Sequence, residues 1–317
     1  MKIVILDGYA SNPGDLSWAE FACFGELSVY PRTAAHEVVS RIADAEVVFL
    51  NKTPISAEVF ERCPKLRMIG ILATGYNIVD IAAAKKHGVI VCNVPGYSTM
   101  AVAQMTFALL LELTQHVGQH SRAVCAGQWQ SSPDFCFWNA PLTELAGKTF
   151  GIVGYGAIGQ AAGRIAQAFG MKLLVTARHE KQVPPDAEFV SLEEILERSD
   201  VISLHCPQTE ENLHMINAAA LEKMKPSAFL INTARGGLID EAALAQALRE
   251  GRLAGYGADV VSKEPISPDN PLLSAPNCCL SPHVAWAPRE TRVRLHHIAA
   301  ENLSAFVSGS PKNIVNP

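Results

Sequence analysis

Short apolar runs alternate with longer segments of helical periodicity along the whole chain. The short runs have the length and β-branched composition of buried strands, and the longer segments repeat apolar residues every three or four positions. This alternation predicts parallel sheets with helices on both faces. Strands are expected at 3–6, 47–50, 68–72, 90–93, 149–153, 172–176, 201–204, 229–232, 255–259 and 279–280. Helices are expected at 34–42, 56–62, 81–87, 100–124, 158–169, 192–198, 241–250 and 290–308.

One strand–helix junction has the glycine pattern of a dinucleotide-binding turn. Residues 151–159 read Gly-Ile-Val-Gly-Tyr-Gly-Ala-Ile-Gly, between an expected strand and an alanine-rich helix. Gly154 would allow the tight turn, Gly156 would let a pyrophosphate approach the backbone, and Gly159 would let the helix pack on the strand. The phosphates would bind the N–H groups at the positive end of the helix dipole. The junction therefore predicts NAD or NADP as cofactor.

The strands fall into two groups, which predicts an α/β protein with two Rossmann-like, doubly wound parallel-sheet domains and a cleft between them. Four strands precede the apolar helix expected at 100–124, and the glycine-rich turn belongs to the second group. The last helix has no sheet of its own, so we expect it to return to the first domain. We therefore expect a substrate-binding domain at 1–99, an inserted NAD(P)-binding Rossmann domain at 100–284, and a returning C-terminal helix at 285–317.

Charge and hydropathy exclude two classes of partner. The chain has 317 residues and a formal net charge of −5. This balance lacks the basic excess that marks binding to nucleic acid or to an anionic membrane. The uncharged stretch 89–111 is long enough to span a membrane, but Asn93 and Pro95 interrupt it. We therefore expect a buried core segment there, and no membrane or nucleic-acid partner.

Cysteine and histidine usage points away from disulfides and metals. None of the eight cysteines forms a Cys-x-x-Cys pattern, which favours reduced thiols. The N-terminal apolar run is too short for a signal peptide, so we expect a cytoplasmic protein. His116 and His120 lie four positions apart without an evident third ligand, and no metal site is expected.

Three residues suited to acid–base chemistry follow expected strands of the second group. They are Arg235, Glu264 and His283. Because ligands bind beyond the carboxyl ends of parallel strands, these side chains should converge beside the nicotinamide. His283 can protonate a carbonyl oxygen that gains charge on hydride transfer, with Glu264 holding its other ring nitrogen. Arg235 offers a planar fork that matches a carboxylate. These roles predict reduction of a 2-oxo acid.

The chain resembles the D-isomer-specific 2-hydroxyacid dehydrogenases over essentially its whole length. The resemblance implies that Arg235, Glu264 and His283 are catalytic, that Asp259 holds the nicotinamide carboxamide, and that backbone N–H groups around Thr74 and Gly75 bind the substrate carboxylate. The matching segments are 73–80, 154–159, 232–236, 257–265 and 281–283. The expected cofactor contacts are Gly154, Tyr155, Gly156, Ala157, Ile158, Gly159, Arg178, Cys206, Pro207, Thr233, Ala234, Arg235, Asp259, His283 and Ala285. The expected substrate contacts are Lys52, Thr74, Gly75, Arg235 and His283.

Within that family, several segments look like the hydroxypyruvate reductases, also called glycerate dehydrogenases. This likeness implies reduction of hydroxypyruvate, and of glyoxylate, to D-glycerate and glycolate by a homodimer. Lys52 would help to place the anionic substrate, although a solvated loop lysine is an equal alternative. Phe135 and Trp138 would either wall a substrate pocket, that of a dimer mate included, or pack in the core. The segments are 6–8, 51–54, 132–138 and 283–286.

The second strand of the cofactor domain departs from the pattern of NAD-dependent relatives. An acid normally ends this strand and binds the ribose 2′-OH, whereas here Ala177 occupies its place and Arg178 follows. This departure predicts NADP in preference to NAD. The alternative is that Arg178 stacks on the adenine and both coenzymes are accepted.

Other functions of proteins with this fold fit these residues less well. An NAD(P)-sensing binding protein, like the transcriptional corepressors of this family, would not need the complete set of Arg235, Glu264 and His283. Oxidation of formate is disfavoured because formate enzymes of the family pair their histidine with a glutamine, where this chain has Glu264. Turnover of another D-2-hydroxy acid stays open.

Overall fold

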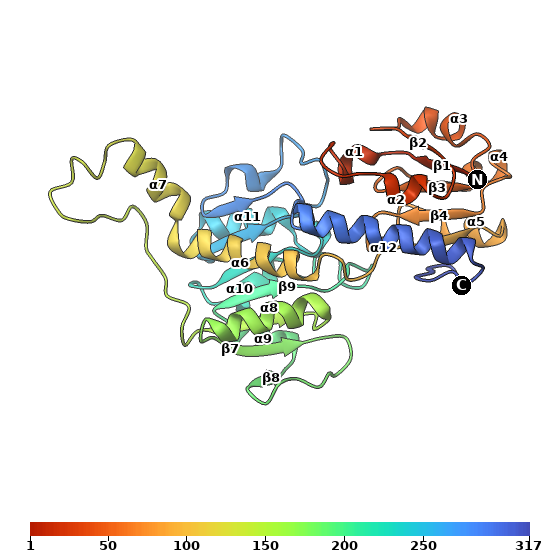
Figure 1. The fold of residues 1–317 in the computed structure, drawn as a ribbon. Helices are drawn as coiled ribbons and strands as arrows, with labels where there is room; N and C mark the ends of the chain where they lie inside the picture. The colour runs from red at the N-terminus through yellow and green to blue at the C-terminus, as the bar shows by residue number, and fades with distance from the viewer. The chain divides into compact units, whose positions relative to one another are not determined.

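The computed structural model describes all 317 residues and divides the chain into two compact units. The first unit consists of Met1–Ser98 and Trp286–Pro317, and the second of Thr99–Ala285. Each contains one parallel sheet with helices packed on it (Figure 1). The expected fold class of two Rossmann-like parallel sheets is thus confirmed. No helix combines the length and the apolar character that a membrane span requires.

The first unit has a five-stranded sheet in the order β2-β1-β3-β4-β5, with every neighbouring pair parallel. Its strands are β1 (Lys2–Ile5), β2 (Glu26–Val29), β3 (Val47–Leu50), β4 (Met68–Ile71) and β5 (Ile90–Cys92). Its helices are α1 (Gly8–Ser11), α2 (Ala19–Ala22), the 3₁₀ turn η1 (Ala35–Glu37), α3 (Val38–Ile42), α4 (Ala57–Arg62), α5 (Ile81–Lys86) and α12 (Arg289–Val307).

Both faces of this first sheet are buried, because successive side chains of a strand point to opposite sides. Ile3 and Ile5 of β1 belong to the core that contains α2 and α12, whereas Val4 belongs to the core that contains α3, α4 and α5. Within the unit, α12 packs on β4 and α2. A strand that is buried on both faces reads as a continuous apolar run, which is why these strands are visible in the sequence.

The second unit has a seven-stranded parallel sheet in the order β12-β11-β10-β9-β6-β7-β8. Its strands are β6 (Thr149–Val153), β7 (Lys172–Thr176), β8 (Ala187–Phe189), β9 (Val201–Leu204), β10 (Phe229–Asn232), β11 (Gly255–Ala258) and β12 (Cys278–Leu280). Its helices are α6 (Thr99–Gln115), α7 (Val117–Cys125), α8 (Ala157–Ala168), α9 (Leu192–Arg198), α10 (Ala218–Lys223), α11 (Glu241–Arg249) and the 3₁₀ turns η2 (Gly236–Leu238) and η3 (Pro271–Ser274). One core lies between the sheet and α6 with α8, and the other between the sheet and α9 to α11.

The single helix expected at 100–124 is wrong, because two helices occupy this segment. His116 adopts a left-handed conformation, with φ of 50°, and separates α6 from α7. The Glu112 carboxylate accepts the Gly118 N–H at 3.1 Å and so caps the start of α7. Nine side chains of α6 are buried, but none of α7 is, so the apolar pattern that marks α6 stops at the break.

The expected count of four strands in the first group is also wrong, because β2 adds a fifth. In the second group, β8 was not expected either. Both strands are short, contain a charged residue and lie at the edge of their sheet. Neither strand contains a fully buried residue, and Glu26 or Glu188 interrupts it, so neither has the apolar run on which the other strands were recognised. The remaining strands begin and end within one residue of the expected positions.

Candidate active site

The glycine-rich turn between β6 and α8 has the form of a phosphate cradle. Gly154 has φ of 100°, a left-handed conformation that favours glycine, and its N–H donates to the Thr176 carbonyl at 2.8 Å. A Cβ at Gly159 would lie 2.2 Å from the Gly154 carbonyl oxygen, so only glycine lets α8 pack this closely. A Cβ at Gly156 would meet nothing within 4 Å. The space above Gly156 is therefore open to a ligand.

The first turn of α8 fits an anion. Gly156 is its N-cap and supplies no side chain, and the first turn contains no acidic residue. The N–H groups at the start of a helix have no partner within the helix, and the helix dipole makes this end positive. Ala157, Ile158 and Gly159 supply these N–H groups. The residues present therefore fit the pyrophosphate of a dinucleotide.

The end of β9 packs against this turn. A Cβ at Gly154 would lie 2.6 Å from the Cys206 backbone nitrogen, so the segment 205–207 borders the cradle. Burial raises the pKa of the Cys206 thiol and lowers the pKa of His205 to about 4, so both side chains are neutral at pH 7. Because both side chains are neutral, they do not repel a bound phosphate and do not offset the positive end of the α8 dipole.

Arg235 follows β10 and is exposed. Its Nη1 donates to the Ala234 carbonyl at 2.6 Å. The backbone beneath it is held by Asn232, whose amide donates to the Arg235 carbonyl at 2.9 Å and accepts the Ala234 N–H at 3.0 Å. A Cβ at Gly236 would lie 1.9 Å from the Val261 carbonyl carbon, so this loop packs directly on the loop that leads to Glu264.

Glu264 and His283 form a hydrogen-bonded pair. Nδ1 of His283 lies 2.6 Å from Oε2 of Glu264, and the two side chains are 30% and 35% exposed. Glu264 follows β11 and His283 follows β12, so neighbouring strands deliver them to the same edge of the sheet. Because the carboxylate occupies Nδ1, the Nε2 atom is the one able to exchange a proton with a ligand.

Asp259 is buried between β11 and the turn that bears His283. Its carboxylate accepts hydrogen bonds from the Ser281 hydroxyl at 2.6 Å, the Val284 N–H at 2.9 Å and the Ala285 N–H at 2.8 Å. His283 lies inside this turn, with φ of 54°. Three donors compensate a carboxylate that is only 1% exposed. The sequence had assigned Asp259 to the cofactor alone, and this bracing of the histidine turn was missed.

Lys52, Thr74 and Gly75 belong to the first unit. The buried Asp7 carboxylate, at the end of β1, accepts the N–H groups of Asn51, Lys52 and Thr53 at 2.7, 2.6 and 2.9 Å. Asp7 therefore shapes the loop after β3 and leaves the Lys52 side chain exposed. Sequence reasoning missed Asp7, although an acid directly after an apolar strand was the available signal.

The loop after β4 presents its backbone rather than its side chains. The Thr74 hydroxyl donates to the Val94 carbonyl at 2.8 Å, and the Thr74 carbonyl accepts the Asn93 amide at 2.7 Å. The N–H groups of Thr74 and Gly75 have no such partner. Backbone N–H groups without a backbone acceptor can donate to an anion.

Comparison with known proteins agrees with this geometry. Residues 107–285 match the model of the D-isomer specific 2-hydroxyacid dehydrogenase, NAD binding domain. The chain is 51% identical to hydroxypyruvate reductase of Blautia hydrogenotrophica over 100% of both chains. It is 41% identical to glycerate dehydrogenase of Methylorubrum extorquens over 99% of this chain and 98% of the relative. Among solved structures, an acyclic imino acid reductase in complex with NADPH and D-arginine superposes with a TM-score of 0.86 and 31% identity, covering 99% of this chain and 100% of the other.

The two relatives match essentially the whole chain. The Asn-Thr-Ala-Arg, Glu-Pro and Ser-Pro-His segments follow the three adjacent strands β10, β11 and β12, at the same edge of the parallel sheet as the glycine-rich turn after β6. The chain belongs to the family of D-isomer-specific 2-hydroxyacid dehydrogenases.

Proposed function

We propose that the protein reduces hydroxypyruvate, and also glyoxylate, to D-glycerate and glycolate. The observation that carries this proposal is the 2.6 Å contact between His283 and Glu264, at the end of a sheet whose glycine-rich turn fits a dinucleotide. A scaffold that only sensed the cofactor would not need an oriented proton donor. The names of the relatives, hydroxypyruvate reductase and glycerate dehydrogenase, support the choice of substrate.

Reduction of a 2-oxo acid consumes one hydride and one proton. The nicotinamide, when bound, supplies the hydride to the carbonyl carbon. His283 donates the proton from Nε2 to the carbonyl oxygen, which becomes the hydroxyl of the product. Glu264 accepts the Nδ1–H bond, orients the ring and stabilises the imidazolium before transfer. The reverse reaction returns the proton to His283.

The substrate carboxylate is the second anchor. The exposed fork of Arg235 can bind two carboxylate oxygens at once, which a lysine ammonium cannot do. In the first unit, we assign the N–H groups of Thr74 and Gly75 and the side chain of Lys52 to binding of the anionic substrate. Asp259, Ala285 and the Thr233–Arg235 loop would hold the nicotinamide when it is bound.

NADPH is the proposed coenzyme. Ala177 follows β7 where an acid would repel a 2′-phosphate, and Arg178 comes next with a side chain that is 72% exposed. An exposed guanidinium suits a phosphate that arrives from solvent. The NADPH complex of the imino acid reductase, which has the same fold, supports the compatibility of this fold with NADPH.

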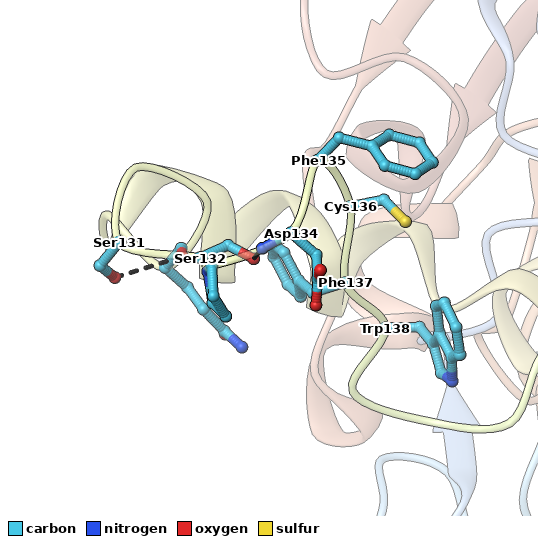
Figure 2. A pocket seen from close by; sticks show the side chains of 9 residues that line it. Ser131, Ser132, Asp134, Phe135, Cys136, Phe137 and Trp138 are labelled. Atoms are coloured by element: carbon cyan, nitrogen blue, oxygen red, sulfur yellow. Dashed lines mark hydrogen bonds between the residues drawn. The ribbon is translucent and has the colours of Figure 1, made fainter.

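A homodimer in the cytoplasm is the proposed state. The arm, defined as residues 117–142, carries α7 and a loop that projects from the second unit (Figure 1). Phe135 is 90% exposed and Trp138 is 66% exposed. Figure 2 shows both side chains on this loop. The loop is nevertheless ordered by hydrogen bonds, including a reciprocal pair between the Gln128 and Asn139 side chains at 2.9 and 3.0 Å. An ordered arm with exposed aromatic side chains fits a second copy of the chain.

The eight free cysteines are in keeping with a reducing compartment.

Initial rates with a small panel of 2-oxo acids test the substrate assignment. Hydroxypyruvate and glyoxylate should have higher kcat/KM values than pyruvate, 2-oxobutyrate and 2-oxoisocaproate, each measured with NADPH and with NADH. A higher value for a longer 2-oxo acid would contradict the proposal.

Sedimentation equilibrium of the wild type and of the double variant Phe135→Ser with Trp138→Ser tests the dimer. The double substitution should weaken association of the two copies.

A further inference from the structure

The side chain of Arg178 is paired with an acid from another strand end. Its Nη2 lies 3.3 Å from Oε2 of Glu211, and the two side chains are 72% and 74% exposed. Glu211 comes 33 positions later in the chain, in the loop after β9. An exposed ion pair contributes little to folding stability, so a structural role explains this contact poorly.

We propose that Glu211 is a specificity-determining residue for the coenzyme. Its carboxylate takes the place of the acid that is missing at Ala177, and it competes with a 2′-phosphate for Arg178. The inference rests on the proposed assignment of Arg178 to the 2′ position of the coenzyme. It extends that assignment, because Arg178 alone predicts a simple preference for NADPH.

Three segments meet around the cradle, and their contacts place this ion pair beside it. The Gly154 N–H donates to the carbonyl of Thr176, two residues before Arg178. The same Gly154 packs against the Cys206 backbone, where the Glu211 loop begins. The ion pair therefore joins the loop after β7 to the loop after β9, and β6 with its glycine-rich turn lies between these two strands.

The loop that bears Glu211 is ordered by the residue next to it. The Asn212 amide donates to the Pro207 carbonyl at 2.8 Å, and its oxygen accepts the Thr209 N–H at 2.7 Å. These bonds fold the loop back on itself and hold Glu211 in a defined position. Only its terminal carboxylate, in contact with Arg178, is free to exchange this partner for a ligand.

The two coenzymes make opposite demands on the pair. A ribose 2′-OH donates a hydrogen bond, which a carboxylate accepts well, as the strand-end acid does in NAD-dependent relatives. A 2′-phosphate is an anion that binds Arg178 and is repelled by Glu211. The Glu211 carboxylate should therefore favour the binding of NADH and weaken the binding of NADPH. As a result, the wild type should prefer NADPH over NADH by less than Ala177 and Arg178 alone would imply.

Glu211→Gln keeps the shape of the side chain and removes its charge. We expect kcat/KM to rise about 2- to 5-fold for NADPH, the range of an exposed ion pair. We expect kcat/KM for NADH to fall about 2- to 10-fold, because a charged acceptor becomes a neutral one. Glu210→Gln is the matched control, since Glu210 is the adjacent residue with the same charge and without the ion pair to Arg178.

Calorimetry gives a readout that is independent of turnover. Glu211→Gln should tighten the binding of adenosine 2′,5′-bisphosphate and leave that of 5′-AMP unchanged or weaker. In an Arg178→Ala background the gain for the bisphosphate should be smaller, because no guanidinium is released and only the direct repulsion between Glu211 and the 2′-phosphate is relieved. The gain should also shrink at high ionic strength.

The outcomes separate this inference from the proposed function. If Arg178→Ala weakens bisphosphate binding while Glu211→Gln changes neither ligand, the role of Glu211 is overturned and that of Arg178 stands. If Arg178→Ala leaves bisphosphate binding unchanged, the assignment of Arg178 fails and the inference falls with it. An equal effect of Glu210→Gln, or an undiminished gain without Arg178, would overturn competition within the pair.

Discussion

Oδ1 of Asp259 lies 2.6 Å from the hydroxyl oxygen of Ser281 and 2.9 Å from the Val284 nitrogen, on the two sides of His283. The end of β11 is thereby fastened to the turn after β12. The left-handed conformation of His283, which is costly for a residue with a Cβ, is maintained by these bonds. Asp259 thus positions His283, the proposed proton donor.

Replacement of Asp259 by Asn should lower turnover. The new amide group would face an N–H donor of Val284 or Ala285, and the turn would shift with His283. A loss of about 1–3 kcal/mol corresponds to a decrease in kcat of roughly 10- to 100-fold. Steady-state kinetics measure kcat, and fluorescence titration measures coenzyme affinity. Ser281→Ala, which removes one donor only, should have a smaller effect. A loss confined to coenzyme affinity would contradict the positioning role.

His283→Ala should lower kcat by roughly 10²–10⁴ because the alkoxide loses its proton donor. Glu264→Gln should retain the hydrogen bond but not the stabilisation of the imidazolium, and should be intermediate. Steady-state rates of both variants in the two directions check this, and near-normal turnover by His283→Ala would remove the residue from the mechanism.

Arg235→Lys keeps the positive charge but loses the planar fork, so it should raise KM for hydroxypyruvate more than it alters coenzyme binding. A loss of one charge-assisted hydrogen bond, about 1.5–3 kcal/mol, corresponds to roughly a 10- to 100-fold change in kcat/KM. Product inhibition by D-glycerate provides a second measure. An unaltered KM for hydroxypyruvate would show that the carboxylate contact is assigned wrongly.

Ala177→Asp combined with Arg178→Ala should move the preference from NADPH toward NADH. The acid repels a 2′-phosphate and binds a 2′-OH, and the guanidinium is gone. The kcat/KM ratio of the two coenzymes should shift by roughly 10- to 100-fold, as expected for one charge-assisted contact. Hydroxypyruvate KM serves as the control and should hardly change. No shift toward NADH in the double variant would disprove the assignment.

Acid should destabilise the protein between pH 7 and pH 5. Burial lowers the pKa of His296 to about 4, and the positive charge of Arg292 lowers it further. The imidazole of His296 is stacked on the Trp18 ring, with 4.4 Å between the ring centroids. Burial likewise lowers the pKa of His205 to about 4. The unfolded chain binds these protons near pH 6.5, before the folded state does, so the stabilisation is complete above pH 6.5 and is lost as the pH falls toward 4. Each histidine should cost about 1–2 kcal/mol at pH 5.

Thermal melts of the wild type and His296→Gln at both pH values test this dependence. Gln can still bond to the Ser11 hydroxyl, which lies 3.1 Å from Nε2 of His296, but it does not titrate. On acidification, the melting temperature of His296→Gln should fall by less than that of the wild type. His297→Gln, on the exposed face of the same helix, is the matched control and should respond like the wild type. An equal response of all three proteins would contradict the prediction for His296.

The sequence alone determined those features that depend on local pattern. Central strands are buried on both faces and read as apolar runs, so β3, β6, β7, β9 and β10 were located to the residue. The glycine-rich turn was recognised because its chemistry lies within nine consecutive residues, and the family resemblance supplied Arg235, Glu264 and His283. Where the local signal is weak, as in the edge strands β2 and β8 or at the break at His116, the expectation was incomplete or wrong.

Only the tertiary structure decided which distant residues touch. Arg178 meets Glu211, Asp259 meets Ser281 and Asp7 meets Lys52, and each pair comes from different strand ends. Such pairs depend on the order of strands in the sheets, β9-β6-β7 in the first case, which no local pattern encodes. Charge and size at a single position do not reveal a partner 22 to 45 residues away. The candidate catalytic residues were therefore recognisable in the chain, whereas the contacts that orient His283 and pair Arg178 with Glu211 became visible only in the fold.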